Sequence, residues 1–284
     1  MKGVTVLFLG CGDLGIRAGR SLLDAGARVI GVRRSAGQLP DNFEAVTADY
    51  TQPGSLAPLA ALAPDYVVTA FKPDGRDEAG YRRGFLGAAN NLVEGLGEHR
   101  PRRVLFVSST RVFAEKAGGW VDEDSPLTTD DPPACRIIDA EQTLSAAGVA
   151  VTSVRCSGIY GDPHGRLLSR IAGGQLCAPE PVSYSNRIHR DDAASFLAHL
   201  IERDEAGDEL ASSYIASDDC PVPQHEVELW LAGQMGLDPG SLRFDAARMV
   251  SGHKRCRNAR LHASGFALSF PDYRAGYDSV LAGR

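Results

Sequence analysis

Three glycines close to the N-terminus have a spacing that suits a nucleotide pyrophosphate. In the stretch LFLGCGDLGIRAGRSLL, Gly10, Gly12 and Gly15 form G-x-G-x-x-G between an apolar run and an amphipathic run, which indicates a strand-to-helix turn. The first glycine permits the tight turn, the second lets the backbone approach the phosphates, and the third allows close helix packing. The first turn of the helix adds unpaired N–H groups and the positive end of the helix dipole. The pattern therefore predicts a dinucleotide site; a glycine-rich turn without a ligand is the alternative.

Three further residues belong to this predicted cofactor-binding loop: Cys11, Asp13 and Leu14. Because a pyrophosphate repels a carboxylate, we expect Asp13 to point away from the phosphates and to cap the helix. Cys11 has two interpretations. It is either an activated thiol at a helix N-terminus or, as we favour, a small residue that the loop tolerates.

The end of the second predicted strand decides which dinucleotide fits. An NAD site usually has Asp or Glu there to hold the ribose 2′-hydroxyl, whereas a 2′-phosphate needs cations and no carboxylate. The sequence is VIGVRRS, in which Arg33 and Arg34 supply bidentate donors and no acid follows until Asp41. We therefore predict NADP(H) as the cofactor and rank NAD(H) below it. Two solvated arginines on a loop are the alternative, because exposed arginine is common.

Short β-branched runs alternate with helical stretches in the first half of the chain. Strands are predicted at 4–9, 28–32, 45–48, 66–69, 103–108 and 149–154, and helices at 14–25, 55–62, 78–96 and 134–147. Strands that are apolar without alternation, and that are separated by helices, indicate a parallel sheet covered on both faces. The fold class is therefore α/β, with a Rossmann-like doubly wound parallel sheet.

The pattern loosens after Arg155. The segments GIYGDPHG and APEPVSYSN are rich in turn residues, a helix is predicted at 190–203, and few strands follow. This change predicts a small C-terminal substrate lobe. We expect an NADP-binding Rossmann domain at 1–158, to which 186–215 returns, and a lobe made of 159–185 and 216–284.

The composition limits the partners of the chain. Its 284 residues carry a formal net charge of -6, which argues against nucleic acid and anionic membranes, since both need clustered cations. The 6 cysteines form no C-x-x-C pair and have no histidine at ligand spacing, which indicates thiols in a reducing compartment and no metal site. We see no signal peptide and no run of about 18 apolar residues that could span a membrane. We therefore predict a cytoplasmic protein with a small-molecule substrate.

Five stretches, in this order, resemble the extended short-chain dehydrogenase/reductase family, also called the NAD-dependent epimerase/dehydratase family. They are TADYTQP, VVTAFKP, VLFVSSTRVFAE, VRCSGIYGD and NRIHRDDAASFL. The resemblance implies that Ser109 is the catalytic serine, which orients the oxygen of the substrate. It also implies cofactor contacts by four residues: Asp49 at the adenine, Ala70, Phe71 and Ser108.

The second catalytic element of the family, a Y-x-x-x-K dyad, is missing. In the family the lysine lies four residues before a helix glutamate, which matches Glu141 in the stretch PPACRIIDAEQTL. That register places Pro133 in the tyrosine slot and Ile137 in the lysine slot. Because a proline cannot donate a proton, a different group must do so if the protein is an enzyme.

Three side chains are candidates for this proton chemistry. Arg136 lies beside the lysine slot and could supply the positive charge, although a guanidinium is a poor proton donor. Tyr160 in GIYG could act as an acid, and its alternative role is packing at the domain junction. His189 titrates in the right range, and its alternative role is structural, at the entry to a helix. The structural role is the more common one for both, and we predict Ser109, Tyr160 and Arg136 as the catalytic set.

The remaining implications of the resemblance concern the substrate and the assembly. Asn186 and Arg187 lie where the family binds substrate, so we lean toward an NADP-dependent oxidoreductase or epimerase acting on a small carbonyl or hydroxyl compound. Family members that act on nucleotide sugars usually carry a larger C-terminal lobe, whereas this lobe has little more than about 100 residues, so we expect a small substrate. An inactive NADP(H)-binding redox sensor and an enzyme that protonates through water both stay open. Helices at 78–96 and 134–147 would pair in a homodimer.

Overall fold

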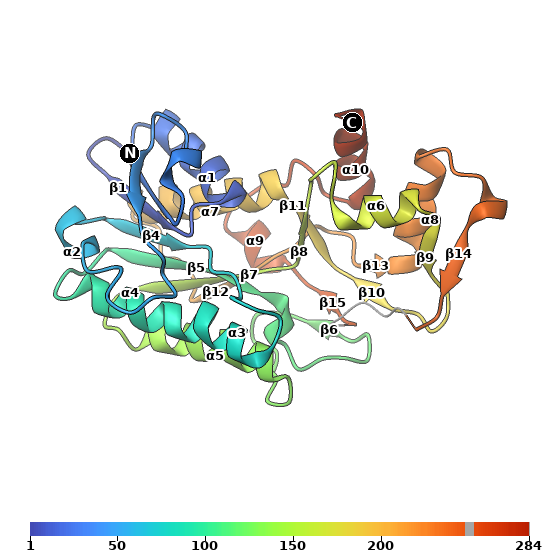
Figure 1. Cartoon of the computed structure of the whole chain (residues 1–284), viewed down its shortest axis with the longest axis horizontal. Helices are drawn as coiled ribbons and strands as arrows, with labels where there is room; N and C mark the ends of the chain where they lie inside the picture. The colour runs from blue at the N-terminus through green and yellow to red at the C-terminus, as the bar shows by residue number, and fades with distance from the viewer. Residues whose placement is uncertain (248–252, 284) are drawn as a thin grey trace. The chain divides into compact units, whose positions relative to one another are not determined.

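The computed structural model describes residues 1–247 and 253–283, which fold as two compact units (Figure 1). The first unit consists of Met1–Val112, Leu127–Arg155 and Ala193–Tyr214, and the second of Phe113–Pro126, Cys156–Asp192 and Ile215–Arg284. The predicted domain boundaries assign 113–126 to the NADP-binding domain, whereas these residues pack in the second unit. The assignment of a substrate lobe stays a prediction.

A seven-stranded parallel sheet forms the core of the first unit, in the order β12-β7-β5-β4-β1-β2-β3. The central strands are apolar and buried on both faces, as a parallel sheet between two helical layers requires. The predicted α/β class with a Rossmann-like doubly wound sheet is confirmed. The sheet and its connections comprise β1 (Thr5–Leu9), α1 (Asp13–Asp24), β2 (Arg28–Arg33), a 3-10 turn (Ala36–Gln38), β3 (Glu44–Thr47), α2 (Leu59–Leu62), β4 (Tyr66–Thr69), α3 (Glu78–Tyr81), a π-helix (Arg82–Gly87), α4 (Ala88–Leu96), β5 (Arg103–Ser109), a 3-10 turn (Thr110–Val112), α5 (Pro132–Ser145), β7 (Val151–Cys156), α7 (Arg190–Glu205) and β12 (Ser213–Ala216).

The direction of winding reverses between β1 and β4. The residue Val6 of β1 pairs with Val29 of β2 on one side and with Tyr66 of β4 on the other. In Figure 1, α1 lies on one face of the sheet, and α4 and α5 lie on the opposite face. Parallel sheets of this kind bind ligands in the crevice at the carboxyl ends of the strands beside such a reversal. The turn after β1 and the loop after β4 flank this position.

The structure differs from the predicted elements in three places. The helix predicted at 55–62 is mostly turn, and only α2 is helical, because Pro58 cannot continue a helix across itself. The helix predicted at 78–96 changes hydrogen-bond pattern in the middle, where Arg82–Gly87 is a π-helix. Strand β12, at the edge of the sheet, was not predicted. Its sequence is only four residues long, which is too short for a periodicity that distinguishes a strand from a loop.

The second unit has a separate, smaller core. It is built from α6, β9, α8 and α10, whose buried residues include Leu168, Leu176, Leu231 and Tyr273. The elements of this unit are β6 (Trp120–Val121), β8 (Gly158–Tyr160), α6 (Arg166–Ala172), β9 (Gln175–Cys177), β10 (Tyr184–Ser185), β11 (Arg187–His189), β13 (Val222–Pro223), α8 (Gln224–Gln234), a 3-10 turn (Pro239–Ser241), β14 (Arg243–Asp245), β15 (Arg255–Cys256), α9 (Ala259–Ala263) and α10 (Tyr273–Ala282).

Among the described residues, no helix combines the length and the apolar character needed to cross a membrane. Within 1–247 and 253–283, no group of three or more His, Cys, Asp or Glu side chains is arranged to bind a metal ion. All six cysteines are free thiols.

Candidate cofactor site and catalytic cluster

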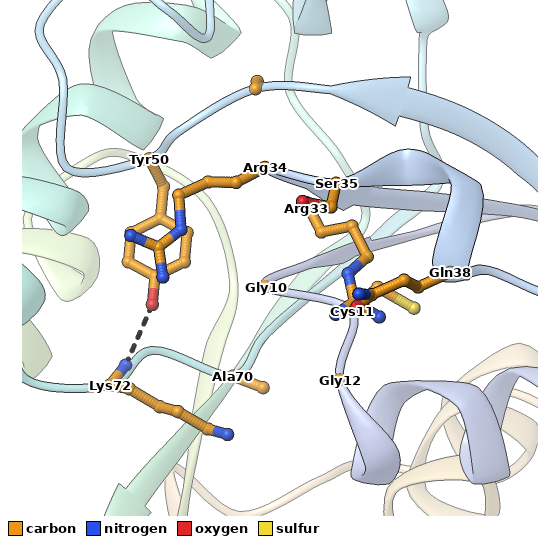
Figure 2. Close-up of a pocket in the computed structure, with 11 residues that line it drawn as sticks. Gly10, Cys11, Gly12, Arg33, Arg34, Ser35, Gln38, Tyr50, Ala70 and Lys72 are labelled. Atoms are coloured by element: carbon orange, nitrogen blue, oxygen red, sulfur yellow. Dashed lines mark hydrogen bonds between the residues drawn. The ribbon is translucent and has the colours of Figure 1, made fainter.

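A cavity of about 310 Å³ lies at the carboxyl ends of β1, β2 and β4 (Figure 2). The glycine turn, the two consecutive arginines and Ala70, all predicted from the sequence to bind the cofactor, contribute to its wall. The lining residues are Gly10, Cys11, Gly12, Arg33, Arg34, Ser35, Gln38, Ala48, Tyr50, Ala70 and Lys72. None of these is Asp or Glu, so the described wall of the cavity carries cations and neutral polar groups.

Each glycine of the loop meets a different steric limit. Gly10 has φ +80°, and a Cβ there would lie 2.8 Å from the carbonyl oxygen of Ala70. A Cβ on Gly12 would be 3.8 Å from its nearest neighbour, so the cavity side of this residue is open. A Cβ on Gly15 would lie 3.3 Å from Sγ of Cys11, inside the contact between α1 and the sheet. These are the three constraints expected of a turn that approaches a pyrophosphate.

Cys11 and Asp13 differ in how well they match their predicted roles. Cys11 is fully buried, and burial raises the pKa of its thiol to about 12, against a smaller lowering by Arg33. An activated thiol is therefore wrong, and Cys11 is the small, packed residue that we favoured. The expected helix cap is also wrong, because α1 has no side-chain cap and Asp13 lies in its first turn. Asp13 instead pairs with Arg17, one turn along the helix, at 3.1 Å.

Two arginines form the cationic side of the cavity, and their side chains contact different residues. Arg33 donates a hydrogen bond to Oε1 of Gln38 at 2.5 Å. Arg34 lies beside Tyr50 (Figure 2). Burial raises the pKa of Tyr50 above its ordinary value, against smaller lowering effects of the backbone N–H of Lys72 and of Arg34. The hydroxyl of Tyr50 accepts the N–H of Lys72 at 3.1 Å. This bond fixes the loop after β4 against the loop after β3.

The resemblance also implied cofactor contacts near Tyr50 and after β4. Ala70 lines the cavity, but Asp49 does not, while its neighbours Ala48 and Tyr50 do. The carboxylate of Asp49 accepts from the N–H and the hydroxyl of Thr51, at 3.0 and 2.7 Å. Phe71 is 6% exposed and packs between the rings of Tyr50 and Phe106. Asp49 and Phe71 therefore do not line the cavity, and they contact residues in or next to its wall.

The side chain of Ser108 points into the core of the first unit. Its hydroxyl donates to Oε1 of Glu141 at 2.6 Å, and Glu141 also pairs with Arg155 at 2.9 Å. All three residues are buried. This buried pair joins β5, α5 and β7. The hydroxyl of Ser108 is thus used in packing, and only the next residue, Ser109, turns its side chain toward solvent.

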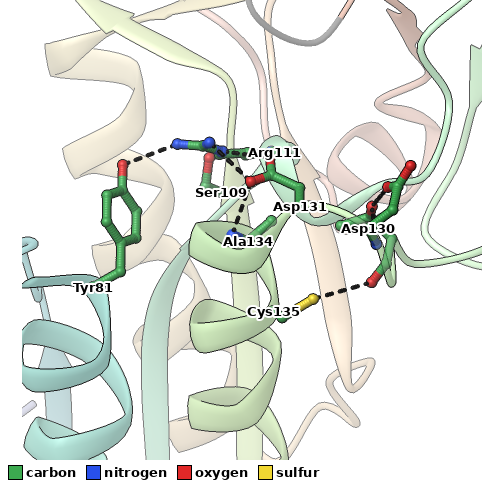
Figure 3. Close-up of polar contacts among 8 residues, drawn as sticks. Tyr81, Ser109, Arg111, Asp130, Asp131, Ala134 and Cys135 are labelled. Carbon is green, nitrogen blue, oxygen red and sulfur yellow. Dashed lines mark hydrogen bonds and ion pairs between the residues drawn. The ribbon is translucent and has the colours of Figure 1, made fainter. Parts of the chain in front are cut away.

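Ser109 belongs to a polar cluster at the end of β5 that we call the Arg111 cluster, made of Tyr81, Ser109, Arg111 and Asp131 (Figure 3). The backbone N–H of Arg111 donates to Oγ of Ser109 at 3.2 Å. The guanidinium of Arg111 makes a bidentate pair with Asp131, at 2.7 and 2.9 Å. Its remaining nitrogen, Nη1, donates to the hydroxyl of Tyr81 at 3.1 Å. All four side chains are partly exposed, so a small molecule can reach them.

Tyr81 is held in place by an unusually close approach of backbone segments. A Cβ on Gly84 would lie 2.2 Å from the carbonyl oxygen of Lys72, and a Cβ on Gly80 would lie 2.4 Å from Cα of Gly75. Gly84 lies within the π-helix that begins after Tyr81, and π-helical turns occur often at functional sites. The two glycines therefore fix the helix start against the loop after β4.

We expect Gly84→Ala to lower the free energy of unfolding by on the order of 1–3 kcal/mol, because the new methyl group overlaps the backbone of Lys72. Gly87→Ala is the matched control, since its Cβ would have no neighbour closer than 3.4 Å. Removing backbone freedom there should stabilise the helix by about 0.5–1 kcal/mol. Urea denaturation of both variants gives the measurement, and equal stabilities would contradict the packing argument.

Comparison with known proteins identifies the family of this chain. A family model described as NAD(P)H-binding matches residues 10–204. A solved structure from Methylobacillus flagellatus, described as a candidate NAD-dependent epimerase/dehydratase, is 35% identical in sequence. The alignment covers 99% of this chain and 98% of that one, with a TM-score of 0.81. The chain belongs to the NAD-dependent epimerase/dehydratase family.

Two more similarities fit this family. Protein YeeZ of Escherichia coli strain K12 is 25% identical over 195 residues, which make up 66% of each chain, so this chain spans just under two thirds of that relative. A structure of MoeE5 in complex with UDP-glucuronic acid and NAD is 20% identical, covers 99% of this chain and 98% of MoeE5, and has a TM-score of 0.80. The second similarity is one of fold. The chain is thus an NAD(P)-binding protein of this family.

The residues that the sequence matched to the two dyad slots lie in helix α5. Pro133 lies in the first turn of α5, after the capping residue Asp131. Ile137 is 2% exposed, so a lysine there would have to bury its charge. Arg136 pairs with Asp139 at 2.9 Å and approaches Glu78 at 3.7 Å. These carboxylates hold the guanidinium of Arg136 on the surface of α5, and we do not carry it into the proposed chemistry.

The two other candidate proton donors lie in the second unit and are packed. The hydroxyl of Tyr160 is buried against α10, since a Cβ on Gly276 would lie 1.7 Å from it. Burial also raises the pKa of Tyr160. His189 is 3% exposed and lies between the rings of Tyr160 and Phe270, with centroid distances of 5.3 and 4.0 Å. His189 thus has the structural position at a helix entry that the sequence left open, and the residues that pack against Tyr160 lie within the second unit.

The predicted substrate residues are also engaged within the second unit. The amide of Asn186 donates to the carbonyl of Lys254 at 3.0 Å and accepts the N–H of Cys256 at 2.8 Å, so it holds strand β15. Arg187 is 5% exposed and donates to Ser185. Substrate binding by Asn186 would require these bonds to break. Arg187 retains one buried nitrogen, Nη1, with no hydrogen-bond partner among the described residues.

Several residues of the site were missed from the sequence. Tyr50, Lys72 and Arg111 stand within the stretches TADYTQP, VVTAFKP and VLFVSSTRVFAE, which were recognised as family-like. The sequence does not show in which direction their side chains point. Tyr81 lies outside every recognised stretch. Only its hydrogen bond with Arg111 in the folded chain identifies it as part of the site.

Proposed function

We propose that this protein is an NADP(H)-dependent oxidoreductase or epimerase that acts on a small carbonyl or hydroxyl compound. The observation that carries the proposal is the wall of the cavity at the glycine turn. Arg33, Arg34 and Lys72 line it, and none of its lining residues is acidic. A ribose 2′-phosphate needs cations and the absence of a carboxylate, whereas a free 2′-hydroxyl is usually held by Asp or Glu.

The residues present fit such a cofactor at both of its ends. The first turn of α1 offers backbone N–H groups to the pyrophosphate, whereas the N–H groups of the turn at Gly10–Gly12 already donate to backbone carbonyls. Lys72 adds a point charge from the loop after β4. Further along the strand ends, the hydroxyl of Ser109 would orient the oxygen of the substrate. When bound, the cofactor supplies or accepts a hydride, and the chain supplies binding, orientation and the proton.

The cofactor preference is tested by replacing both arginines. In the wild type we expect NADPH to bind about 10- to 100-fold more tightly than NADH, since each charge-assisted bond to the phosphate contributes about 1.5–3 kcal/mol before desolvation. Arg33→Ala/Arg34→Ala should abolish this difference and leave NADH affinity almost unchanged. Titration calorimetry with both nucleotides gives the two dissociation constants.

Arg28→Ala is the matched control for this experiment. Arg28 begins the same strand, β2, at the opposite end of the sheet, and it pairs with Glu44. Its removal takes one positive charge from the chain, against two in the double variant, without touching the cavity. A preference for NADH in the wild type, or a preference for NADPH that survives in the double variant, would overturn the assignment.

A further inference from the structure

We propose that Tyr81 is the proton donor and acceptor of the reaction, and that Arg111 orients its hydroxyl next to Ser109. This inference rests on the proposed NADP(H)-dependent chemistry and deepens it. Tyr81 comes from α3, a part of the chain to which no catalytic role was assigned.

The geometry of the Arg111 cluster supports this role. One residue, Arg111, holds both hydroxyl groups: its backbone N–H donates to Ser109 at 3.2 Å and its Nη1 donates to Tyr81 at 3.1 Å. In Figure 3 the hydroxyl of Tyr81 points toward the guanidinium, and Ser109 lies under the same group. The cluster stands at the carboxyl end of β5, next to β4. That edge of a doubly wound sheet is where ligands bind.

The bonds of Arg111 leave the proton of Tyr81 available. A guanidinium has only donors, so the phenol oxygen must accept the bond from Nη1 and its own proton points elsewhere. The pKa of Arg111 is raised, chiefly by its hydrogen bond to Asp131, so the guanidinium stays protonated throughout turnover. A fixed cation beside the oxygen stabilises the phenolate that remains after proton transfer.

The position of Tyr81 is fixed from several sides. Asp77 caps α3 and accepts the N–H of Gly80 at 2.9 Å. The ring of Tyr81 stacks on Phe85, with centroids 5.6 Å apart, and the guanidinium of Arg111 lies 5.3 Å from the centre of the same ring. A general acid must be positioned before proton transfer. A hydroxyl held in this way is already positioned and does not lose conformational freedom at each turnover.

The proposed step balances as follows. In the direction of reduction, the carbonyl carbon accepts a hydride from NADPH, and the C=O π bond breaks toward oxygen. The hydroxyl of Tyr81 gives its proton to that oxygen, and the products are an alcohol, NADP⁺ and the phenolate of Tyr81. Solvent returns the proton to the phenolate. In the direction of oxidation the phenolate removes the hydroxyl proton of the alcohol as the hydride leaves carbon.

Tyr81→Phe tests the proposal because phenylalanine keeps the ring packing and removes only the hydroxyl. NADPH consumption is measured with diacetyl, benzaldehyde and phenanthrenequinone as carbonyl probes, and NADPH affinity is measured separately by fluorescence titration. We expect kcat to fall by at least about 10²-fold with the NADPH dissociation constant unchanged, which is the usual contribution of one general acid. Arg111→Lys, which keeps the charge, should retain more turnover than Arg111→Met.

Tyr66→Phe is the matched control, since it also removes a hydrogen-bonded hydroxyl. Tyr66 lies at the amino end of β4, and its hydroxyl donates to Glu205 at 3.2 Å. It should keep wild-type turnover. If Tyr81→Phe reduces the probes as fast as the wild type, the inference is overturned while the proposed function stands. If Tyr81→Phe also loses NADPH affinity, Tyr81 is structural and the inference fails. If the wild type binds NADPH but reduces none of the probes, the proposed chemistry and the inference both fail.

Discussion

Replacing Ser109 by alanine should lower turnover by about 10²-fold or more while leaving NADPH affinity unchanged. Ser109 ends β5 at the edge of the sheet where ligands bind, and its side chain is partly exposed. A positioned hydroxyl there can donate to the oxygen on which negative charge develops. The cavity at the glycine turn has other residues in its wall, so cofactor binding should not depend on this hydroxyl. Steady-state kinetics with the carbonyl probes and fluorescence titration with NADPH separate the two effects.

Ser108→Ala provides the contrast, because it removes a hydroxyl from the preceding residue of the same strand. Ser108 donates to the buried Glu141 at 2.6 Å, so its loss should reduce stability more than turnover. If both alanine variants keep wild-type turnover, the hydroxyl of Ser109 has no part in catalysis. If instead the wild type binds NADPH but never turns over, the redox-sensing module left open by the sequence is favoured.

Glu141→Leu should lower the free energy of unfolding by about 3–5 kcal/mol, because it removes the carboxylate that pairs with the buried guanidinium of Arg155. The side chains of Arg155 and Glu141 are only 8% and 9% exposed. The hydroxyl of Ser108 loses its acceptor in the same variant. Urea denaturation at neutral pH measures the change. Leucine and glutamate have similar helix propensities, so α5 itself should not cause the loss.

Two further variants separate the buried pair from salt bridges in general. Glu44→Leu breaks the exposed pair with Arg28, whose side chains are 44% and 49% exposed, and should change stability by less than about 1 kcal/mol. Glu141→Leu/Arg155→Met removes both buried charges, and it should recover much of the stability lost in Glu141→Leu. A double variant as unstable as the single one would show that packing, not the unpaired charge, is responsible.

The sequence by itself determined the fold class and the cofactor end of the site. The G-x-G-x-x-G pattern is local because it describes one turn and one helix start, although the steric limit on Gly10 comes from Ala70 in the loop after β4. Arg33 ends β2 and Arg34 follows it, and β2 lies next to β1, so strand order alone brings the pair to the cavity. Apolar strands alternating with helices were sufficient to predict the parallel sheet.

Only the tertiary structure decided which side chains meet at the other end. Tyr81 and Arg111 are 30 positions apart and come from different elements, and nothing in the sequence specifies that α3 directs this ring toward β5. Tyr160 and Arg136 had suitable chemistry at suitable positions, but one hydroxyl packs against Gly276 and the other side chain is held by Asp139. Side-chain direction and burial depend on the packing of whole elements. Spacing along the chain therefore indicates which residues are candidates for the site. The packing of the folded chain decides which of their side chains lie together.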